Sequence, residues 1–210
     1  MPVKLQPEPV DFFTKVQKKG EEFLAKTPKP TEREWKAHRY WQLALDDLYR
    51  AYSGICAFSC HWIPPLTGGK SVEHFKPKSK YPEEAYHWDN YRLVCGTLNG
   101  RKGNHEDVLD PFTLQENWFV LHFPSLQLRP GEHLSKTDSK RVLDTIKRLK
   151  LNDQICLDER KSWLIPYVTG KCPMLYMEEK APFLAYELKR QELDDVNHPM
   201  WEEYKKWLRA

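Results

Sequence analysis

Residues 56–104 read CAFSCHWIPPLTGGKSVEHFKPKSKYPEEAYHWDNYRLVCGTLNGRKGN, and this stretch decides the predicted fold. Ser71–Phe75 and Tyr91–Cys95 carry the apolar and β-branched residues that are typical of short strands. The segment between them contains two prolines and mixed charges, which is typical of a loop. Residues 96–104 are compatible with a short helix that puts Asn99 and Lys102 on one side. The stretch therefore predicts strand, loop, strand and helix in that order.

Polar residues of this stretch match the needs of phosphodiester hydrolysis with one metal ion. That reaction requires an activated water and a Lewis acid for the charge that builds on the phosphate oxygens. A histidine such as His74 can take the proton of the water near neutral pH. Glu73 and Asn99 offer the hard oxygen ligands that Mg²⁺ or Mn²⁺ prefers. We expect Asn90 to brace the loop and Lys102 to contact the phosphate.

The position of Glu73 next to His74 leaves a geometric question open. Adjacent residues of a regular strand point to opposite faces, so the two side chains cannot both face one site on an ideal strand. Either the strand ends or bulges at this point, or Glu73 reaches the ion from the side or through a water molecule.

The ordered residues Glu73, His74, Asn90 and Asn99 resemble the motif of the HNH endonuclease family, whose core is the ββα-metal finger. The resemblance implies that His74 is the general base and that Asn90 holds it in place across the loop. It also implies that Asn99 binds the metal with the help of Glu73. Lys102 stands where many members of the family carry a lysine. The motif covers about a quarter of the chain, and four elements in the right order are more specific than any single dipeptide.

Three further stretches extend the resemblance beyond the motif, together with Arg160. They are VEHFKPKSKYP, LDPF at residues 109–112 and TIKRLKLN at residues 145–152. These stretches are similar to the HNH effector subfamily of Septu-type and retron-associated anti-phage systems. That resemblance implies a role in defence and an ATPase as a partner protein.

The cysteines depart from the pattern of many HNH proteins, which brace the finger with two Cys-x-x-Cys pairs around a structural Zn²⁺. Here Ser59 and Leu98 stand where the second cysteine of each pair would be. Cys56, Cys60 and Cys95 with a histidine could substitute only in an unusual geometry. Because Leu98 cannot bind a metal, we expect no structural zinc.

The basic residues gather around the motif although the formal net charge of the chain is only +3. Between residues 70 and 102 there are seven lysines and arginines against four acidic residues. Such a local excess favours a polyanionic backbone and salt-dependent binding. DNA is favoured over RNA, although no residue reads as a base-recognition element. The predicted nucleic-acid contacts are Lys76, Lys78, Arg92 and Arg101.

The flanks predict helices and one hairpin. Val10–Lys26 has spaced apolar residues, and Thr31 with Glu34 forms a capping box that opens a helix to about Tyr52. Trp118–Phe123 and Leu126–Arg129 suggest a hairpin. Further helices are predicted at Thr137–Leu151 and after Pro199, the last with Trp201, Tyr204 and Leu208 in one stripe.

The whole chain is expected to have an α+β fold, with a small ββα-metal core embedded in a mainly α-helical single domain. Its predicted segments are a helical one at 1–52, the nuclease core at 53–115, and a hairpin with helices at 116–210. No apolar run has the length of a membrane span, and the N-terminus lacks an apolar signal core. Five cysteines at irregular spacing argue against a disulfide framework. We therefore expect a cytoplasmic location.

Each site assignment has a plainer alternative. His74 could be a core histidine, Asn90 a turn residue, and Asn99 with Gly100 a hairpin turn. Asp110 is more often a turn or cap residue than a ligand. The alternative function is a catalytically silent, HNH-derived module that binds nucleic acid or a partner protein. The missing zinc ligands favour that alternative, whereas the full set of candidate catalytic residues favours a metal-dependent endonuclease.

Overall fold

The computed structural model describes residues 3–207, which form two compact units. Of these residues, 3–59 and 63–114 form the N-terminal unit, and 60–62 and 115–207 form the C-terminal unit. The outermost residues of the predicted 1–52 and 116–210 segments lie outside the described residues, and so does Leu208. Helices and two small antiparallel sheets share the chain, which confirms the α+β class.

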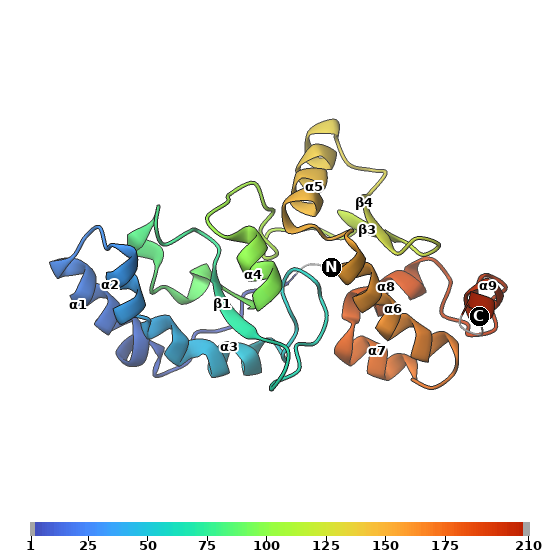
Figure 1. Ribbon diagram of the computed structural model, residues 1–210, viewed down its shortest axis with the longest axis horizontal. Coiled ribbons are helices and arrows are strands. Elements are labelled where there is room, and N and C mark those ends of the chain that lie inside the picture. The colour runs from blue at the N-terminus through green and yellow to red at the C-terminus, as the bar shows by residue number, and fades with distance from the viewer. Residues whose placement is uncertain (1–2, 208–210) are drawn as a thin grey trace. The chain divides into compact units, whose positions relative to one another are not determined.

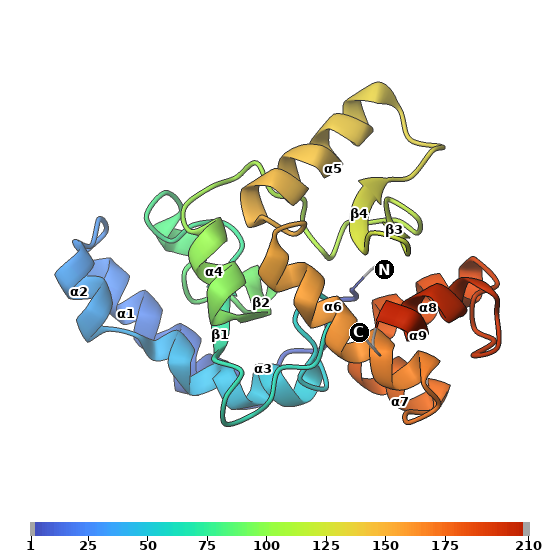
Figure 2. The same cartoon turned by 45° about the vertical axis from the view of Figure 1, so that its right-hand side comes forward.

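The centre of the N-terminal unit is a ββα arrangement (Figure 2). Strand β1 (Lys70–His74) pairs with β2 (Tyr91–Cys95) in antiparallel register, from Lys70 opposite Cys95 to His74 opposite Tyr91. Helix α4 (Gly96–Lys102) follows β2 directly. The loop between the strands contains two short 3-10 turns, η3 (Pro82–Glu84) and η4 (Trp88–Asn90). The predicted order of strand, loop, strand and helix is confirmed.

Helices precede this arrangement in the chain (Figure 1). A π-helical turn, η1 (Phe13–Gln17), leads into α1 (Lys18–Lys26). The predicted capping box opens α2 (Glu32–Ala37), where the side chains and backbones of Thr31 and Glu34 bond reciprocally. The single helix predicted from Thr31 to about Tyr52 is wrong. The chain breaks after α2, and then forms the 3-10 turn η2 (Tyr40–Ala44) and helix α3 (Leu45–Ala51).

The helix breaks at His38. Its backbone leaves the helical region with ψ at 48°, and its ring stacks on Phe23 with the ring centroids 3.8 Å apart. Its Nδ1 also lies 2.9 Å from the backbone oxygen of Glu34. The tertiary contact with α1 therefore outweighs the helix propensity of the segment.

An aromatic core joins these helices to the sheet. Trp41 packs between Trp35 and Tyr86, with ring centroids 6.1 and 5.8 Å away. Trp41 also meets the ring of His74 edge-on at 4.9 Å. Because these rings are buried, they fix the position of His74 from the side of the helices.

The C-terminal unit contains the predicted hairpin, formed by β3 (Phe119–His122) and β4 (Gln127–Pro130). It is followed by α5 (Lys136–Leu149), which confirms the helix predicted at Thr137–Leu151. Arg160 is buried, and its guanidinium donates to the backbone oxygens of Leu126 and Leu151. In this unit Arg160 therefore ties the hairpin to the end of α5.

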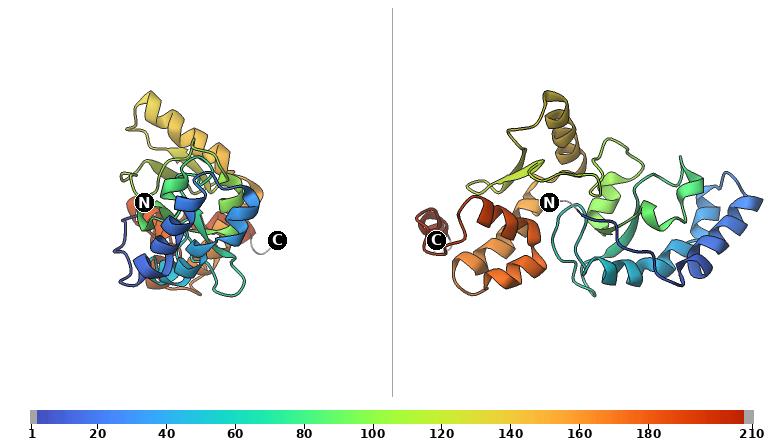
Figure 3. Two further views of the ribbon diagram at one scale, coloured as in Figure 1. Left: turned by 90° about the vertical axis from the view of Figure 1, so that its left-hand side faces the viewer. Right: turned by 180° about the vertical axis from the view of Figure 1, so that it is seen from behind.

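Three helices between α5 and the C-terminal end were not predicted, and Figure 3 shows them in orange and red. Helix α6 (Gln154–Val168) carries Pro166 in its interior, and its apolar residues follow no single face, so periodicity does not mark it in the sequence. Its start does carry a local signal, because the side chain of Asp153 caps it by accepting from the backbone N–H of Cys156. The last helix was predicted after Pro199, and its Trp201 is fully buried. The bounds are α6 (Gln154–Val168), α7 (Met174–Lys180), α8 (Pro182–Arg190) and α9 (Met200–Trp207). No helix of the part of the chain that the structure describes is long and apolar enough to span a membrane.

Candidate functional site

A pocket of about 650 Å³ lies along β1 in the N-terminal unit. All five residues of β1 border it, so residues of both strand faces meet the same space. This is possible because the sheet has only two strands, which leaves one edge of β1 unpaired, and because β1 ends at His74. Glu73 and His74 therefore do border one pocket. Other residues that line it are Arg39, Trp41, Lys78 and Asn99.

His74 is held as a neutral ring with a defined proton. Its Nε2 lies 2.9 Å from the backbone oxygen of Ala85, and a carbonyl oxygen can only accept a hydrogen bond. Nε2 must therefore carry the proton, which leaves the lone pair on Nδ1. No described residue hydrogen-bonds to that Nδ1. Burial, with smaller effects from the charges of Lys78 and Lys102, lowers the pKa of His74 to about 3. The ring is thus uncharged at neutral pH, with its one proton on Nε2.

Asn90 cross-links the loop that follows β1. Its Oδ1 accepts from the backbone N–H of Lys76 at 2.7 Å. Its Nδ2 donates to the backbone oxygens of Lys76 and Glu84 at 3.1 and 3.0 Å. The side chain of Asn90 is buried. Glu84 directly precedes Ala85, whose backbone oxygen accepts from His74. Asn90 therefore fixes the loop whose backbone holds His74.

The amide of Asn99 has a defined orientation. Ser71 Oγ donates its proton to the backbone oxygen of Val94 at 2.8 Å, so it can only accept from Asn99. Asn99 Nδ2 donates to that Oγ at 2.9 Å. The carbonyl oxygen, Oδ1, must then point away from Ser71, and no described residue donates to it. Asn99 thus presents an oxygen ligand at a pocket that it shares with His74.

Glu73 and Lys102 form a buried ion pair. Lys102 Nζ lies 2.7 Å from Glu73 Oε1 and 3.2 Å from the backbone oxygen of His74. The lysine is completely buried, so its ammonium does not line the pocket in this structure. Burial raises the pKa of Glu73 to about 7, although the charge of Lys102 acts in the opposite direction. The phosphate contact of Lys102 remains a prediction, and it would require this pair to open.

The donor set at the pocket fits a hard divalent cation. Glu73 has a second carboxylate oxygen that accepts no hydrogen bond from a described residue, and Asn99 offers its Oδ1. One carboxylate and one amide oxygen, with positions left for water and substrate, suit Mg²⁺ or Mn²⁺. A bound cation would also favour the ionised form of Glu73, whose charge burial disfavours.

The four predicted nucleic-acid contacts have different surroundings. Arg92 is buried, donates to both carboxylate oxygens of Asp110 at 2.8 and 2.7 Å, and stacks on Phe112. These contacts give Arg92 a structural role, so its guanidinium is not available to bind a phosphate in this structure. Lys76 is exposed and pairs with Glu84. Lys78 borders the pocket, and Arg101 lies half-buried on α4.

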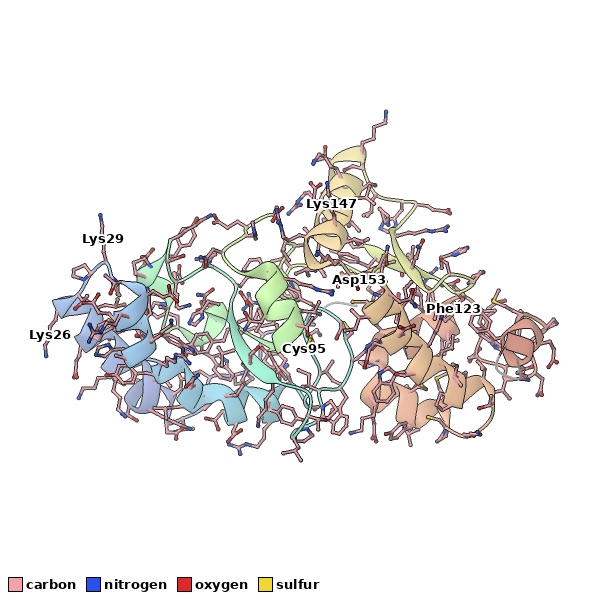
Figure 4. All side chains as sticks on the ribbon, viewed as in Figure 1. Lys26, Lys29, Cys95, Phe123, Lys147 and Asp153 are labelled. Atoms are coloured by element: carbon pink, nitrogen blue, oxygen red, sulfur yellow. The ribbon has the colours of Figure 1, made fainter. Side chains whose placement is uncertain are left out.

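The three cysteines considered for zinc are divided between the two units. Cys56 and Cys95 belong to the N-terminal unit and Cys60 to the other unit. Cys95 lies at the start of α4 (Figure 4), where its backbone N–H donates to Cys56 Sγ at 3.5 Å. Burial raises the pKa of the Cys56 thiol, but hydrogen bonds from Cys95 and Ser59 outweigh it and lower that pKa to about 6.

A different group of metal-ligating atoms occurs in the loop. Glu84, His87 and Asp89 place one ligand atom each within 4.8 Å of one another. Glu84 is already neutralised by Lys76, and the group is partly exposed.

Arg39 and Trp41 are among the pocket residues that were not predicted from the sequence. Both follow the break after α2. The sequence gives no signal for that break, because no glycine or proline lies between Ala37 and Tyr40. A regular helix through this segment would have directed these side chains differently. No local signal in the sequence could have placed them beside His74.

Comparison with known proteins gives one short similarity. No family model matches the chain. Over 40 residues the chain is 42% identical to the Septu protein PtuB of Bacillus thuringiensis. The matched segment is 19% of this chain and spans only 16% of the length of PtuB. The chain is therefore similar to a Septu protein over one segment.

Proposed function

We propose that the chain is a metal-dependent HNH endonuclease that hydrolyses nucleic-acid phosphodiester bonds. The observation that carries the proposal is the shared pocket of Glu73, His74 and Asn99 on a ββα frame. At this pocket His74 Nδ1 and Asn99 Oδ1 are both acceptors, and the contacts of the frame fix the direction of each. A histidine that served only core packing would not require oriented oxygen ligands in the same pocket.

In the proposed reaction, His74 Nδ1 takes a proton from a water molecule whose oxygen attacks the phosphorus. The bond to the leaving sugar oxygen breaks, and that oxygen takes up a proton from solvent. Glu73 and Asn99 would hold Mg²⁺ or Mn²⁺, which supplies Lewis-acid stabilisation of the charge on the phosphate. Asn90 is a positioning residue, because it acts on His74 through the loop.

We also propose a role in defence against phage, together with a partner ATPase. The support is the resemblance of the motif region to the HNH effector subfamily and the similarity to the Septu protein PtuB. Control by a partner would keep a nuclease from damaging the nucleic acid of its own cell.

A catalytically silent binding module is the second candidate, and the Glu73–Lys102 pair favours it. The ammonium of Lys102 already satisfies one oxygen of the carboxylate proposed to hold the ion. A buried lysine that remained there would compete with a cation for Glu73.

Cleavage of plasmid DNA and of total RNA with Mg²⁺, Mn²⁺ or EDTA tests the proposal. We expect metal-dependent cutting by the purified protein that is lost in His74→Ala. His87→Ala is the matched control, because His87 does not line the pocket. If His74→Ala cut at the wild-type rate, His74 would not be the general base. Absence of cutting, both alone and with the partner ATPase, would favour the silent module.

A further inference from the structure

Four cationic side chains line the pocket, but only two of them have an acidic partner. Lys36 lies 3.0 Å from Glu32, and Lys70 lies 2.6 Å from Asp46. Arg39 and Lys78 make no ion pair with any residue of the described range 3–207. The pocket therefore keeps two positive charges that the protein does not neutralise.

These two charges are close enough to act on each other. Burial is the largest cause that lowers the pKa of Lys78, and the charge of Arg39 lowers it further. The carboxylates of Glu73 and Glu32 act in the opposite direction without reaching ion-pair distance. Lys78 Nζ also lies 5.4 Å above the ring of Trp41. Two like charges that line one pocket favour the binding of an anion, because an anion relieves their repulsion and offsets the lost hydration of Lys78, which is half-buried whereas Arg39 is exposed.

The backbone segments that carry the two side chains are hydrogen-bonded within the protein before any ligand arrives. Lys78 belongs to a tight turn, in which the backbone N–H groups of Lys80 and Tyr81 both donate to the oxygen of Pro77 at 2.9 Å. Asn90 anchors the same turn through Lys76. Arg39 belongs to the break between α2 and η2. A site whose elements are fixed in advance loses less entropy when it binds.

We propose that Arg39 and Lys78 form a phosphate-binding site for the backbone of a nucleic-acid strand that lies over the pocket. Arg39 offers a planar fork of N–H donors to the non-bridging oxygens, and Lys78 adds a point charge. The ligand class rests on the proposed function of the same pocket. This site takes over the role predicted for Arg92 and Lys102, whose charges are buried in ion pairs with Asp110 and Glu73.

The test measures binding of a fluorescent 20-nucleotide probe as single-stranded DNA, duplex DNA and RNA, with EDTA present so that no metal-dependent cutting occurs. The proteins are the wild type, Arg39→Gln, Lys78→Gln and the double variant. Lys19→Gln is the matched control, because Lys19 is exposed in the same unit and does not line the pocket. Affinity is measured between 50 and 300 mM salt, and thermal melts report folding.

Each pocket substitution should remove one phosphate contact. For a single strand the salt slope should then fall by about 0.7, which is about a five-fold loss of affinity at 0.1 M salt. The double variant should lose both contacts, whereas Lys19→Gln should keep the wild-type slope. Arg39→Lys and Lys78→Arg keep the charge and should retain most of the slope. The probe that shows the largest change identifies the natural form of the strand.

Slopes of Arg39→Gln and Lys78→Gln equal to that of Lys19→Gln would overturn the phosphate site, and so would a wild-type protein that binds none of the probes. These outcomes differ from failure of the proposed function. If His74→Ala still cuts while the slopes fall as expected, the phosphate site stands and the catalytic assignment is wrong.

Discussion

At the scale of single residues, the candidate site depends on which atoms the frame leaves available. The backbone oxygen of Ala85 accepts the hydrogen bond from His74 Nε2, and Ser71 Oγ accepts one from Asn99 Nδ2. In both side chains one end serves structure, and the other end remains an acceptor. The same principle explains why Lys102 and Arg92 are poor candidates for substrate contacts, because their donors already bond to the carboxylates of Glu73 and Asp110.

Ser71→Ala should weaken the use of metal by the proposed nuclease. The hydroxyl of Ser71 fixes the amide of Asn99, so its loss allows the amide to rotate and to present Nδ2 to the pocket. Loss of such a supporting partner typically lowers metal affinity or activity 10- to 100-fold, so we expect a change of about that size. The measurement is the cleavage rate as a function of Mn²⁺ concentration.

Two variants distinguish positioning from a general loss of stability. Ser79→Ala changes another serine that lines the pocket and should leave the Mn²⁺ dependence unchanged. Ser71→Thr retains a hydroxyl and should recover most of the activity. An Mn²⁺ dependence of Ser71→Ala that matches the wild type would show that Ser71 does not position the ligand.

At the scale of elements, α1 packs against the same aromatic core that contains His74. Gly20 lies in α1, where a Cβ would come within 2.1 Å of the ring of Tyr86. Tyr86 packs on Trp41, and Trp41 packs on His74. Two aromatic rings therefore connect Gly20 to the candidate base.

Gly20→Ala should destabilise the protein although alanine is the better helix former. Helix propensity favours alanine by about 1 kcal/mol, whereas overpacking a buried site costs about 1–3 kcal/mol. The atoms in the way are Cγ, Cδ2 and Cβ of Tyr86, which cannot move aside without shifting the whole ring. We expect the steric term to win, with a net loss of about 1 kcal/mol in urea unfolding.

Lys19→Ala is the control for this effect, because it changes the neighbouring exposed residue of α1 without touching the core. It should leave the free energy of unfolding within about 0.5 kcal/mol of the wild type. A Gly20→Ala protein that is more stable than the wild type would mean that Tyr86 has room to move.

At the scale of the whole molecule, buried titratable groups in both units make stability depend on pH. Burial lowers the pKa of His61 and of His74 to about 3, with Arg160 acting on His61 in the same direction. Between pH 6.5 and 3 the unfolded chain protonates these rings while the folded chain does not. The unfolded state then binds more protons, so the free energy of unfolding falls as the pH drops, by about 1.4 kcal/mol per pH unit for each ring.

Glu73 acts in the opposite sense. Its pKa is raised to about 7, so the folded chain keeps a proton between pH 4.5 and 7 that the unfolded chain releases. Its contribution to stability is therefore present at low pH and is lost as the pH rises through that window. Between pH 4.5 and 6.5 it offsets one of the two histidines, and the net loss on acidification is about 1.4 kcal/mol per pH unit.

Urea unfolding in EDTA at pH 7, 6 and 5 measures this dependence. His61→Asn removes one of the two histidines, so the loss between pH 6 and 5 should nearly vanish in this variant. A slope of His61→Asn that equals the wild-type slope would show that His61 is protonated in the folded protein as readily as in the unfolded chain.

The sequence by itself determined the local elements of this protein. Alternation of apolar residues, proline-rich loop composition and the Thr31–Glu34 capping box are local signals, and the strands, hairpin and helix starts that they predict are present. The order of Glu73, His74, Asn90 and Asn99 also follows from the sequence. Because the ββα frame is local, the structure brings Glu73, His74 and Asn99 to one pocket.

Only the tertiary structure decided which charges face that pocket. The break after α2 depends on the stacking of His38 on Phe23, and it places Arg39 and Trp41 at the site. Burial of Lys102 against Glu73 likewise depends on how α4 packs on β1. A linear pattern records that a residue is basic, but whether its charge is neutralised depends on partners distant in sequence.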